Sequence, residues 1–213
     1  MTHCKRMVLR VSSEFGAIVL AAGQSERFQS NKFLADVSGQ PLLQRTLTPF
    51  IELKPYIKAL CVVTGAYTAE LQPLLQELAV KQSHNADYKL GGMSSSIKRG
   101  LIGVQEQVIS YLGVFIHPGD IPFILRQDLL TMISTQEMNC SKIVIPTFEG
   151  RKGHPLLIHS SLIHELSNLK ESRQGLRGFL VDHSDEIDFA ASSNPGILHD
   201  IDYPRDLEGI ALI

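Results

Sequence analysis

Short apolar runs alternate with longer segments of helical periodicity along most of this chain, and this alternation limits the possible fold more than any other feature. Four runs are rich in β-branched residues: 17–22 (AIVLAA), 60–64 (LCVVT), 112–117 (LGVFIH) and 142–146 (KIVIP). Each is too short for a buried helix and has an apolar character on both faces. They therefore predict strands that are buried on both sides.

Between these runs, apolar residues recur at helical spacing. The main predicted helices cover residues 43–50, 71–78, 97–104 and 125–133, and shorter ones are expected at 161–169 and 173–181. Pro41 precedes the first helix, and Pro73 is expected to delay the start of the second. The alternation predicts a three-layer α/β/α sandwich with a mostly parallel central sheet, whose ligands bind beyond the carboxyl ends of the strands.

Length and composition restrict the domain count and the class of ligand. A chain of 213 residues with 44% hydrophobic content can bury one sizeable core, so we expect a single domain over 15–213 with an N-terminal extension at 1–14. The formal charge of −2 gives no reason to expect nucleic acid or an anionic membrane as a partner.

The expected compartment is the cytoplasm. The three cysteines, Cys4, Cys61 and Cys140, fit neither a disulfide framework nor a zinc site, which favours a reducing environment. The N-terminal stretch lacks the apolar segment of a signal peptide, and no run approaches the ~18 apolar residues of a membrane span.

The loop after the first predicted strand has the composition of a phosphate-binding loop. In IVLAAGQSERFQSNK, small residues at Gly23 and just before it let a ligand approach the backbone, while Arg27 and Lys32 supply positive charge. An ordinary polar loop with solvated basic residues is the alternative interpretation. The segment matches neither GxxxxGK[ST] nor GxGxxG, so the P-loop and Rossmann dinucleotide interpretations both lose support.

Other segments place polar residues at predicted strand or helix ends. GGMSSSIKRGL, 91–101, puts three serines immediately before a predicted helix, and capping alone would explain one of them. FIHPGDIPFI, 115–124, ends a strand with a turn that carries Asp120, which could also be a turn former. EGRKGHPLLI, 149–158, clusters basic residues on a loop that could simply be solvated.

The C-terminal segment GILHDIDYPRDL supplies further carboxylates. Asp200 and Asp202 point to the same face if this segment is extended, and Asp206 is expected to cap the last helix. Hard cations such as Mg²⁺ prefer carboxylate, water and phosphate oxygens as ligands.

Taken in order, these segments resemble the motifs of the MobA-like nucleotidyltransferases, in particular the molybdenum cofactor cytidylyltransferases. The resembling stretches are 20–32 (LAAGxSxRxGxxK), 92–101 (GMxSSLxxGL), 119–123 (GDMPF), 151–158 (RRGHPVLF) and 200–206 (DIDTPxD). Gln29 stands where the family usually has glycine, and Tyr203 stands where it usually has threonine. The resemblance implies a fold of the nucleotide-diphospho-sugar transferase type.

The resemblance also implies a role for particular residues. It implies nucleotide binding by Leu20, Ala21, Ala22, Gly23, Ser25, Arg27, Lys32, Ser95 and Ser96. Lys32, Arg27 and Asp120 are the implied catalytic residues, and Arg151, Gly153 and His154 the implied acceptor-binding residues. Asp120 and Asp202 are the implied ligands of Mg²⁺, with Asp200 as the alternative to Asp202.

The implied reaction is transfer of CMP from CTP to the terminal phosphate of molybdopterin, with release of pyrophosphate. A molybdoenzyme or its chaperone is then a candidate protein partner. Two alternatives stay open: a transferase that uses GTP or another NTP with a different phosphorylated acceptor, and a nucleotide-binding regulatory or cofactor-delivery protein that has lost turnover. The departures at Gln29 and Tyr203 prompt the second.

Overall fold

The computed structural model describes residues 14–28 and 30–208 of the 213-residue chain. The expected N-terminal extension, 1–14, therefore lies almost entirely outside the described residues, as does Gln29. Within the described part of the chain, no helix combines the length and the apolar character needed to cross a membrane.

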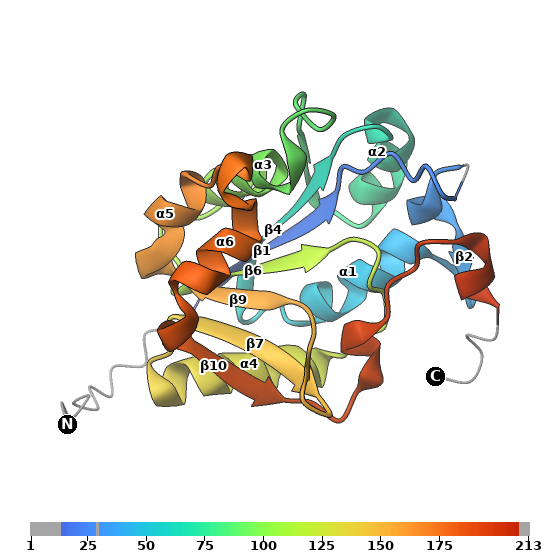
Figure 1. The fold of residues 1–213 in the computed structure, drawn as a ribbon. Helices are drawn as coiled ribbons and strands as arrows, with labels where there is room; N and C mark the ends of the chain where they lie inside the picture. The colour runs from blue at the N-terminus through green and yellow to red at the C-terminus, as the bar shows by residue number, and fades with distance from the viewer. Residues whose placement is uncertain (1–13, 29, 209–213) are drawn as a thin grey trace, which may run out of the picture.

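A mixed β-sheet forms the centre of the molecule (Figure 1). Its strands are β1 (Phe15–Ala21), β4 (Ile57–Thr64), β5 (Lys81–His84), β6 (Gly113–Pro118), β7 (Ile143–Phe148), β8 (Arg151–Lys152), β9 (Leu156–His159) and β10 (Ile187–Ala191). They lie in the order β10-β7-β9-β6-β1-β4-β5, with β8 paired to β7. Pairing is parallel except for β9 with its neighbours and β8 with β7. The sheet is thus mostly parallel, as predicted, and the four predicted strands are β1, β4, β6 and β7.

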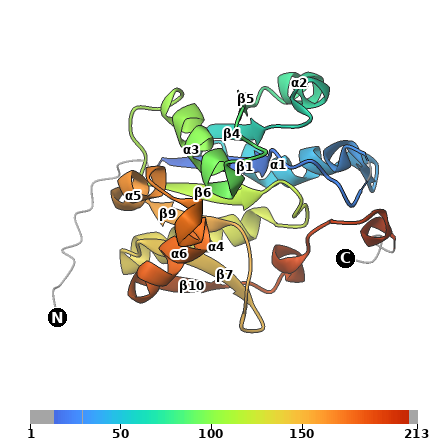
Figure 2. The same cartoon turned by 45° about the horizontal axis from the view of Figure 1, so that its top comes forward.

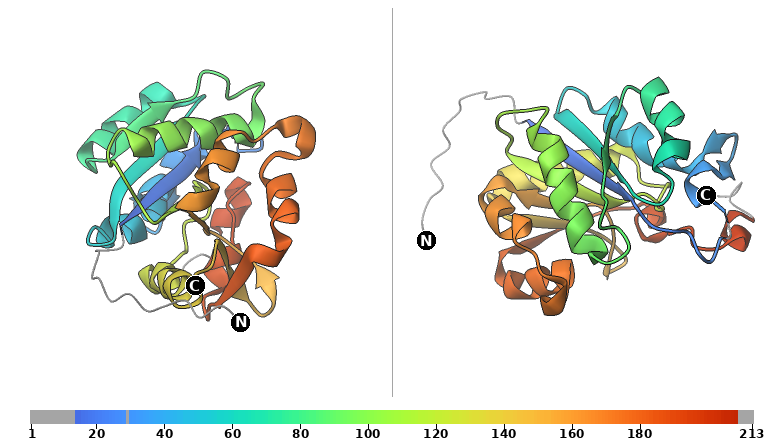
Figure 3. Two further views of the ribbon diagram at one scale, coloured as in Figure 1. Left: turned by 90° about the vertical axis from the view of Figure 1, so that its left-hand side faces the viewer. Right: turned by 90° about the horizontal axis from the view of Figure 1, so that it is seen from above.

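Helices cover both faces of this sheet (Figures 2 and 3). They are α1 (Leu42–Glu52), α2 (Thr68–Glu77), α3 (Gly92–Gln105), α4 (Arg126–Asn139), α5 (Ile163–Ser167) and α6 (Gly175–Asp182). The apolar sides of α1, α2 and α4 join the core on one face, and those of α3, α5 and α6 join the core on the other. This arrangement confirms the predicted three-layer sandwich. A small hairpin, β2 (Asp36–Val37) with β3 (Gln40–Pro41), lies outside the main sheet.

Strand β1 shows why the apolar runs become central strands. Val19 belongs to the core on the α1 face and Ile18 to the core on the α3 face, and both are fully buried. Alternating side chains on opposite faces give this result when both faces are covered by helices. Helix α3 packs closely on β1 at Gly100, where a Cβ atom would lie 2.3 Å from Ile18. Glycine at this position therefore permits the close approach that fixes α3 over β1.

Two local expectations were wrong. Pro73 does not delay α2, which begins at Thr68 and contains the proline in its interior. The three serines do not precede α3, because this helix begins at Gly92 and includes them in its first turns. Gly92 has a φ of +59°, a value that glycine adopts readily and that allows the chain to enter the helix early.

The strand register brings four loops to one edge of the sheet. Ala21 pairs with Thr64, Thr64 with His84, and Leu20 with Pro118, so these parallel strands end at one level. The loops that follow β1, β4, β5 and β6 therefore emerge side by side. In Figure 1, the C-terminal segment, drawn in red, returns to this edge beside the blue loop that follows β1.

Candidate functional site

A lysine and two aspartates from distant parts of the sequence meet at this edge. Lys32 begins the short 3₁₀ helix η1 (Lys32–Leu34), Asp120 follows β6, and Asp202 lies in the C-terminal segment. The Nζ atom of Lys32 donates to Asp120 Oδ2 at 2.7 Å, to Asp202 Oδ1 at 3.1 Å and to the carbonyl oxygen of Ile201 at 3.0 Å. An ammonium group has three hydrogens, so each of them has an acceptor in the protein.

Lys32 is buried, and its charge is maintained by these partners. Burial alone lowers the pKa of Lys32, but attraction and hydrogen bonding from Asp120 and Asp202 outweigh burial, so the pKa lies above its ordinary value. The side chain of Lys32 is 10% exposed, whereas those of Asp120 and Asp202 are 25% and 32% exposed. The carboxylates thus lie between the buried ammonium group and the solvent.

Arg27 completes the cluster from the loop after β1. Its Nη1 atom donates to Asp202 Oδ2 at 2.7 Å, and its side chain is 63% exposed. The guanidinium carbon lies 5.6 Å from the centre of the Tyr203 ring, and Arg205 lies 4.5 Å from the same ring. Tyr203, which replaces the usual threonine of the family motif, therefore supports the arginine that holds Asp202.

Asp202 and Asp200 have different surroundings. Asp202 lies beside Lys32 and Arg27, whereas Asp200 is exposed and has no hydrogen bond or ion pair with the described residues. Asp206 caps the short helix η6 (Pro204–Leu207), as expected, because its Oδ2 atom accepts from the backbone N–H groups of Asp202 and Tyr203. This cap holds the backbone at Asp202 in place.

A cleft of about 290 Å³ opens next to Asp120. It is lined by Leu20, Ala22, Gly23, Tyr88, Gly92, Met93, Ser96, Pro118 and Asp120. A Cβ atom at Gly23 would meet no other atom within 4 Å, so the loop backbone faces open space there. Ser25 has a φ of +50°, and its buried hydroxyl oxygen has no hydrogen-bond partner among the described residues. This loop offers groups that a bound oxyanion could satisfy.

Two serines of α3 are held by a residue that the sequence analysis missed. Asn85 directly follows β5, and its Nδ2 atom donates to Ser95 Oγ at 2.8 Å and to Ser96 Oγ at 3.0 Å. Strand β5 has the polar sequence KQSH, which contains no apolar run, so neither the strand nor the residue after it was predicted. The sequence carries no signal for Asn85, because its contacts with Ser95 and Ser96 arise only in the fold.

The residues expected to bind the acceptor do not all lie together. His154 is largely buried, and its Nδ1 atom has no hydrogen-bond partner in the part of the chain that the structure describes. Burial lowers the pKa of His154, and the nearby charges of Asp120 and Asp200 oppose this effect. Gly153 is buried beside it, and its N–H donates to Pro146. Arg151, in contrast, is exposed in the β7–β8 hairpin and forms no ion pair with the described residues.

His117 lies beneath this group and is fully buried. Its Nε2 atom is 2.9 Å from the carbonyl oxygen of Ile121, and its ring centre is 6.5 Å from that of His154. Burial, reinforced by repulsion from His154, lowers the pKa of His117 to about 3. The ring is therefore neutral near pH 7 and donates its Nε2 hydrogen to Ile121, the residue after Asp120.

The chemistry of the cluster suits a hard cation that keeps some of its bound water molecules. Asp120 and Asp202 supply carboxylate oxygens, which Mg²⁺ prefers, and their side chains are partly exposed, at 25% and 32%. Among the described residues, no group of three or more His, Cys, Asp or Glu side chains could hold a metal ion by itself. A cation at this site would therefore need further oxygen ligands from water or from a bound phosphate.

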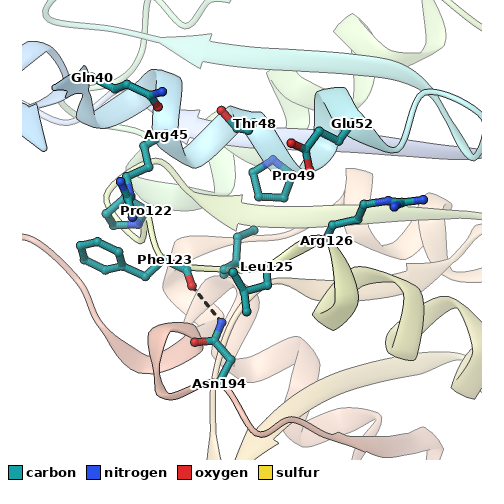
Figure 4. Close-up of a pocket in the computed structure, with 11 residues that line it drawn as sticks. Gln40, Arg45, Thr48, Pro49, Glu52, Pro122, Phe123, Leu125, Arg126 and Asn194 are labelled. Carbon is teal, nitrogen blue, oxygen red and sulfur yellow. Dashed lines mark hydrogen bonds between the residues drawn. The ribbon is translucent and has the colours of Figure 1, made fainter. Parts of the chain in front are cut away.

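A second cavity, of about 360 Å³, lies on the α1 side of the loop that follows Asp120 (Figure 4). Arg45 points toward Pro122, and its guanidinium carbon lies 5.2 Å from the centre of the Phe123 ring. Asn194 closes the opposite side by donating to the Phe123 carbonyl oxygen at 2.8 Å. None of Lys32, Asp120 and Asp202 lines this cavity, so the candidate site is the cleft and not this space.

Comparisons with known proteins identify the family of this chain. The model of the MobA-like NTP transferase domain matches residues 17–187. The 2-C-methyl-D-erythritol 4-phosphate cytidylyltransferase of Shouchella clausii (strain KSM-K16) is 31% identical over 135 residues, which cover 58% of this chain and 52% of that protein. The chain thus matches about half the length of this curated relative.

Solved structures share the fold. A homologue of Mycobacterium tuberculosis Rv0371c from Mycobacterium sp. strain JC1 has a TM-score of 0.77 at 22% identity, covering 94% of this chain and 98% of that one. The M. tuberculosis H37Rv Rv0371C complex with manganese has a TM-score of 0.70 at 17% identity, covering 92% and 97%. With the family model matching most of its length, the chain belongs to the MobA-like NTP transferase family.

Proposed function

We propose that this chain is a nucleotidyltransferase that transfers CMP from CTP to the terminal phosphate of molybdopterin and releases pyrophosphate. The observation that carries the proposal is the meeting of Asp120 and Asp202 at Lys32, beside a cleft lined by Gly23 and Ser96. Membership of the MobA-like family supports nucleotidyl transfer, and the curated relative, a cytidylyltransferase, supports CTP as the donor.

The reaction needs orientation and charge compensation more than it needs a base. An oxygen of the acceptor phosphate attacks the α-phosphorus of CTP, forming a new P–O bond, while the bond from the α-phosphorus to the bridging oxygen breaks and pyrophosphate leaves in line. The second pKa of a phosphate monoester is ~6, so the attacking oxygen is already an anion at neutral pH. Positioning and electrostatic stabilisation then account for most of the catalysis.

The residues of the cluster divide this work. Lys32 holds Asp120 and Asp202 together, because its three hydrogens are directed at protein acceptors. Arg27 is mostly exposed and has further N–H donors beyond the one used by Asp202, so it can reach a phosphate oxygen of the nucleotide. The loop around Gly23 and Ser25 presents donors to the triphosphate.

Asp120 and Asp202 would hold Mg²⁺, whose chemistry at this position is to offset the negative charge of the triphosphate and of the leaving pyrophosphate. The two carboxylates fit this ion because they supply oxygen ligands and leave other positions for water and phosphate. The manganese in the Rv0371C structure is in line with a divalent-cation site in a protein of the same fold.

The choice of acceptor rests on the segment 151–158. Gly153 and His154 follow the β7–β8 hairpin, and His154 lies near Asp120, so an acceptor phosphate bound beside His154 would face the reacting nucleotide. The name of the curated relative supports a second candidate, because that enzyme uses a phosphorylated polyol. Both candidates share CMP transfer and differ only in the molecule that carries the attacking phosphate.

The test combines nucleotide binding with turnover. Thermal unfolding is measured with CTP, GTP, ATP and UTP in the presence of Mg²⁺, for the wild type and for Asp120→Ala. Stabilisation by CTP that depends on Asp120 is expected, and a preference for GTP would move the proposal to guanylyl transfer. Pyrophosphate release is then measured with CTP and either molybdopterin or 2-C-methyl-D-erythritol 4-phosphate.

The acceptor experiment also separates an enzyme from a binding protein. The expected result is that pyrophosphate is released from CTP when molybdopterin is the acceptor and not when the polyol phosphate is. The opposite pattern would overturn the choice of acceptor. Stabilisation by CTP without release for either acceptor would favour a regulatory or cofactor-delivery protein. No stabilisation by any nucleotide would refute nucleotide binding at this cleft.

A further inference from the structure

Asn85 is placed to control the hydrogen-bonding direction of the serines that it holds. It is 4% exposed, and its backbone N–H donates to the carbonyl oxygen of Thr64 at 2.8 Å, which fixes the residue to the end of β4. Its side-chain Oδ1 atom accepts from the backbone N–H of Asp87 at 3.0 Å. The backbone N–H of Asn85 is therefore fixed to β4, and its side chain is fixed to the turn that follows it.

The contact with Asp87 determines which way the amide faces. A backbone N–H can only donate, so the side-chain atom opposite it must be the oxygen of Asn85. The Nδ2 group consequently faces Ser95 and Ser96, and it has one hydrogen for each hydroxyl. Both serine oxygens must then act as acceptors toward Asn85.

The hydrogens of the two serines have different destinations. The hydroxyl of Ser95 donates back to the carbonyl oxygen of Gly92 at 2.9 Å, within the first turn of α3. Ser96 lines the cleft, is 6% exposed, and finds no acceptor for its own hydrogen among the described residues. A buried donor without a partner is unfavourable unless a ligand satisfies it.

We propose that Asn85 is a positioning residue that turns the hydroxyl hydrogen of Ser96 toward the cleft, so that Ser96 donates to an oxygen of the bound nucleotide. The ligand group is a hydrogen-bond acceptor, such as a carbonyl or phosphate oxygen, and not a donor. This assignment rests on the proposed function, because the cleft must hold a nucleotide. Asn85 then contributes to binding through Ser96 and does not contact the ligand itself.

The isosteric substitution Asn85→Asp reverses this direction. One carboxylate oxygen can still accept from Asp87, but the other can only accept, so the hydroxyl of Ser96 must donate to it. The cleft then faces lone pairs of Ser96 where it faced a hydrogen. Ser96→Ala removes the same donor without adding a charge.

The experiment is a double-mutant cycle on CTP affinity, measured by calorimetry in the presence of Mg²⁺ and without acceptor. Ser96→Ala is expected to weaken binding by roughly three- to tenfold, the range for one lost hydrogen bond, and Asn85→Asp by about tenfold or more. In the Ser96→Ala background, Asn85→Asp should cost less than about twofold, because its route of action has been removed. Thermal unfolding without nucleotide reports the effect of each change on the fold alone.

Asn85→Ala provides the same cycle without a new charge and replaces Asn85→Asp if that variant does not fold. Its expected loss is a few-fold and should likewise disappear in the Ser96→Ala background. A loss that persists there would mean that Asn85 affects binding by a route other than Ser96, and it would overturn the positioning role. If the wild type binds CTP normally, such a result leaves the proposed function intact, whereas failure of the wild type to bind any nucleotide refutes the function itself.

Discussion

Two parts of the candidate site differ in whether their polar groups have partners within the protein. In the paired cluster, formed by Arg27, Lys32, Asp120 and Asp202, both carboxylates already have charged partners inside the protein. In the open cleft, by contrast, which is lined by Gly23 and Ser96 and has Ser25 in the loop beside it, the hydroxyl groups of both serines find no acceptor among the described residues. The cluster is therefore formed by folding alone, whereas the cleft needs a ligand to complete its hydrogen bonds.

This difference predicts which substitutions damage the fold and which damage only binding. Removing a member of the paired cluster leaves its partners unpaired and should cost stability as well as activity. Removing a donor of the open cleft takes away a group that has no partner in the protein, so folding should be nearly unaffected. Substitutions in the paired cluster are thus expected to lower both stability and activity, whereas substitutions in the open cleft are expected to weaken ligand binding alone.

Lys32→Met should give the largest effect. It leaves Asp120 and Asp202 facing each other without the buried ammonium group, so pyrophosphate release should fall by about 10²–10³-fold. The free energy of unfolding should fall by about 2 kcal/mol, less than the ~3–5 kcal/mol of a fully buried pair, because the carboxylates keep 25% and 32% exposure. Urea unfolding and a pyrophosphate assay measure the two quantities.

Lys81→Met is the matched control for that substitution. Lys81 pairs with Glu106 at 3.0 Å, and both side chains are more than 40% exposed, at 42% and 45%. Removing an exposed pair should change stability by less than about 1 kcal/mol and leave activity intact. If Lys32→Met unfolds like the wild type and only weakens CTP binding, Lys32 contacts the phosphates directly and the paired cluster is not preformed.

The two C-terminal aspartates test whether proximity to Lys32 decides function. Asp202→Asn keeps the shape of the side chain but loses the charge that meets Lys32 and Arg27, and it should lower turnover by about 100-fold. Asp200→Asn, two residues away and exposed, should have a clearly smaller effect. Turnover measured across a Mg²⁺ titration gives the comparison, and equal losses would show that the cluster extends to Asp200.

The sequence predicted the central strands better than the edges of the sheet. The runs that became β1, β4, β6 and β7 are apolar because helices cover both of their faces. Strand β5 at one edge reads KQSH, and β10 at the other reads IDFAA with partly exposed residues, so neither has the pattern of a buried strand. An edge strand is specified by its backbone pairing with a neighbour, which a single sequence does not display.

The same distinction applies to the candidate site. Motif spacing predicted Lys32, Asp120 and Asp202 as functional residues, and the fold brings these three together. Sequence could not indicate that Lys32 would use all its hydrogens on the protein, because this depends on the path of the C-terminal segment past Ile201. Asn85 was missed for a related reason, since its importance arises from contacts with α3.

His117, which contacts the carbonyl oxygen of Ile121, should also make folding stability depend on pH. The pKa of His117 falls to about 3 in the folded protein, against ~6.5 in the unfolded chain. The unfolded state therefore binds more protons between these values, and stability should decrease as pH falls below about 6.5. From pH 7 to pH 5 the expected loss from His117 alone is about 2 kcal/mol.

Substitution tests this assignment. His117→Phe should reduce the loss between pH 7 and pH 5 by about that amount, measured by urea unfolding at each pH. His164→Gln, on the exposed side of α5, should keep the wild-type dependence. An unchanged pH dependence in His117→Phe would mean that His117 is not held neutral beside Ile121.

Ser25→Ala should give the smallest effect, and it tests whether a hydroxyl group beside the open cleft contributes to binding without contributing to stability. The hydroxyl oxygen of Ser25 is buried without a partner among the described residues, so its removal should change the free energy of unfolding by less than about 0.5 kcal/mol. Binding of CTP should nevertheless weaken by roughly three- to tenfold if the hydroxyl donates to the triphosphate. Thr48→Ala is a control outside the cleft, since its hydroxyl donates to the carbonyl oxygen of Gln44. A loss of stability in Ser25→Ala without a loss of affinity would show that this loop, like the paired cluster, is already complete without a nucleotide.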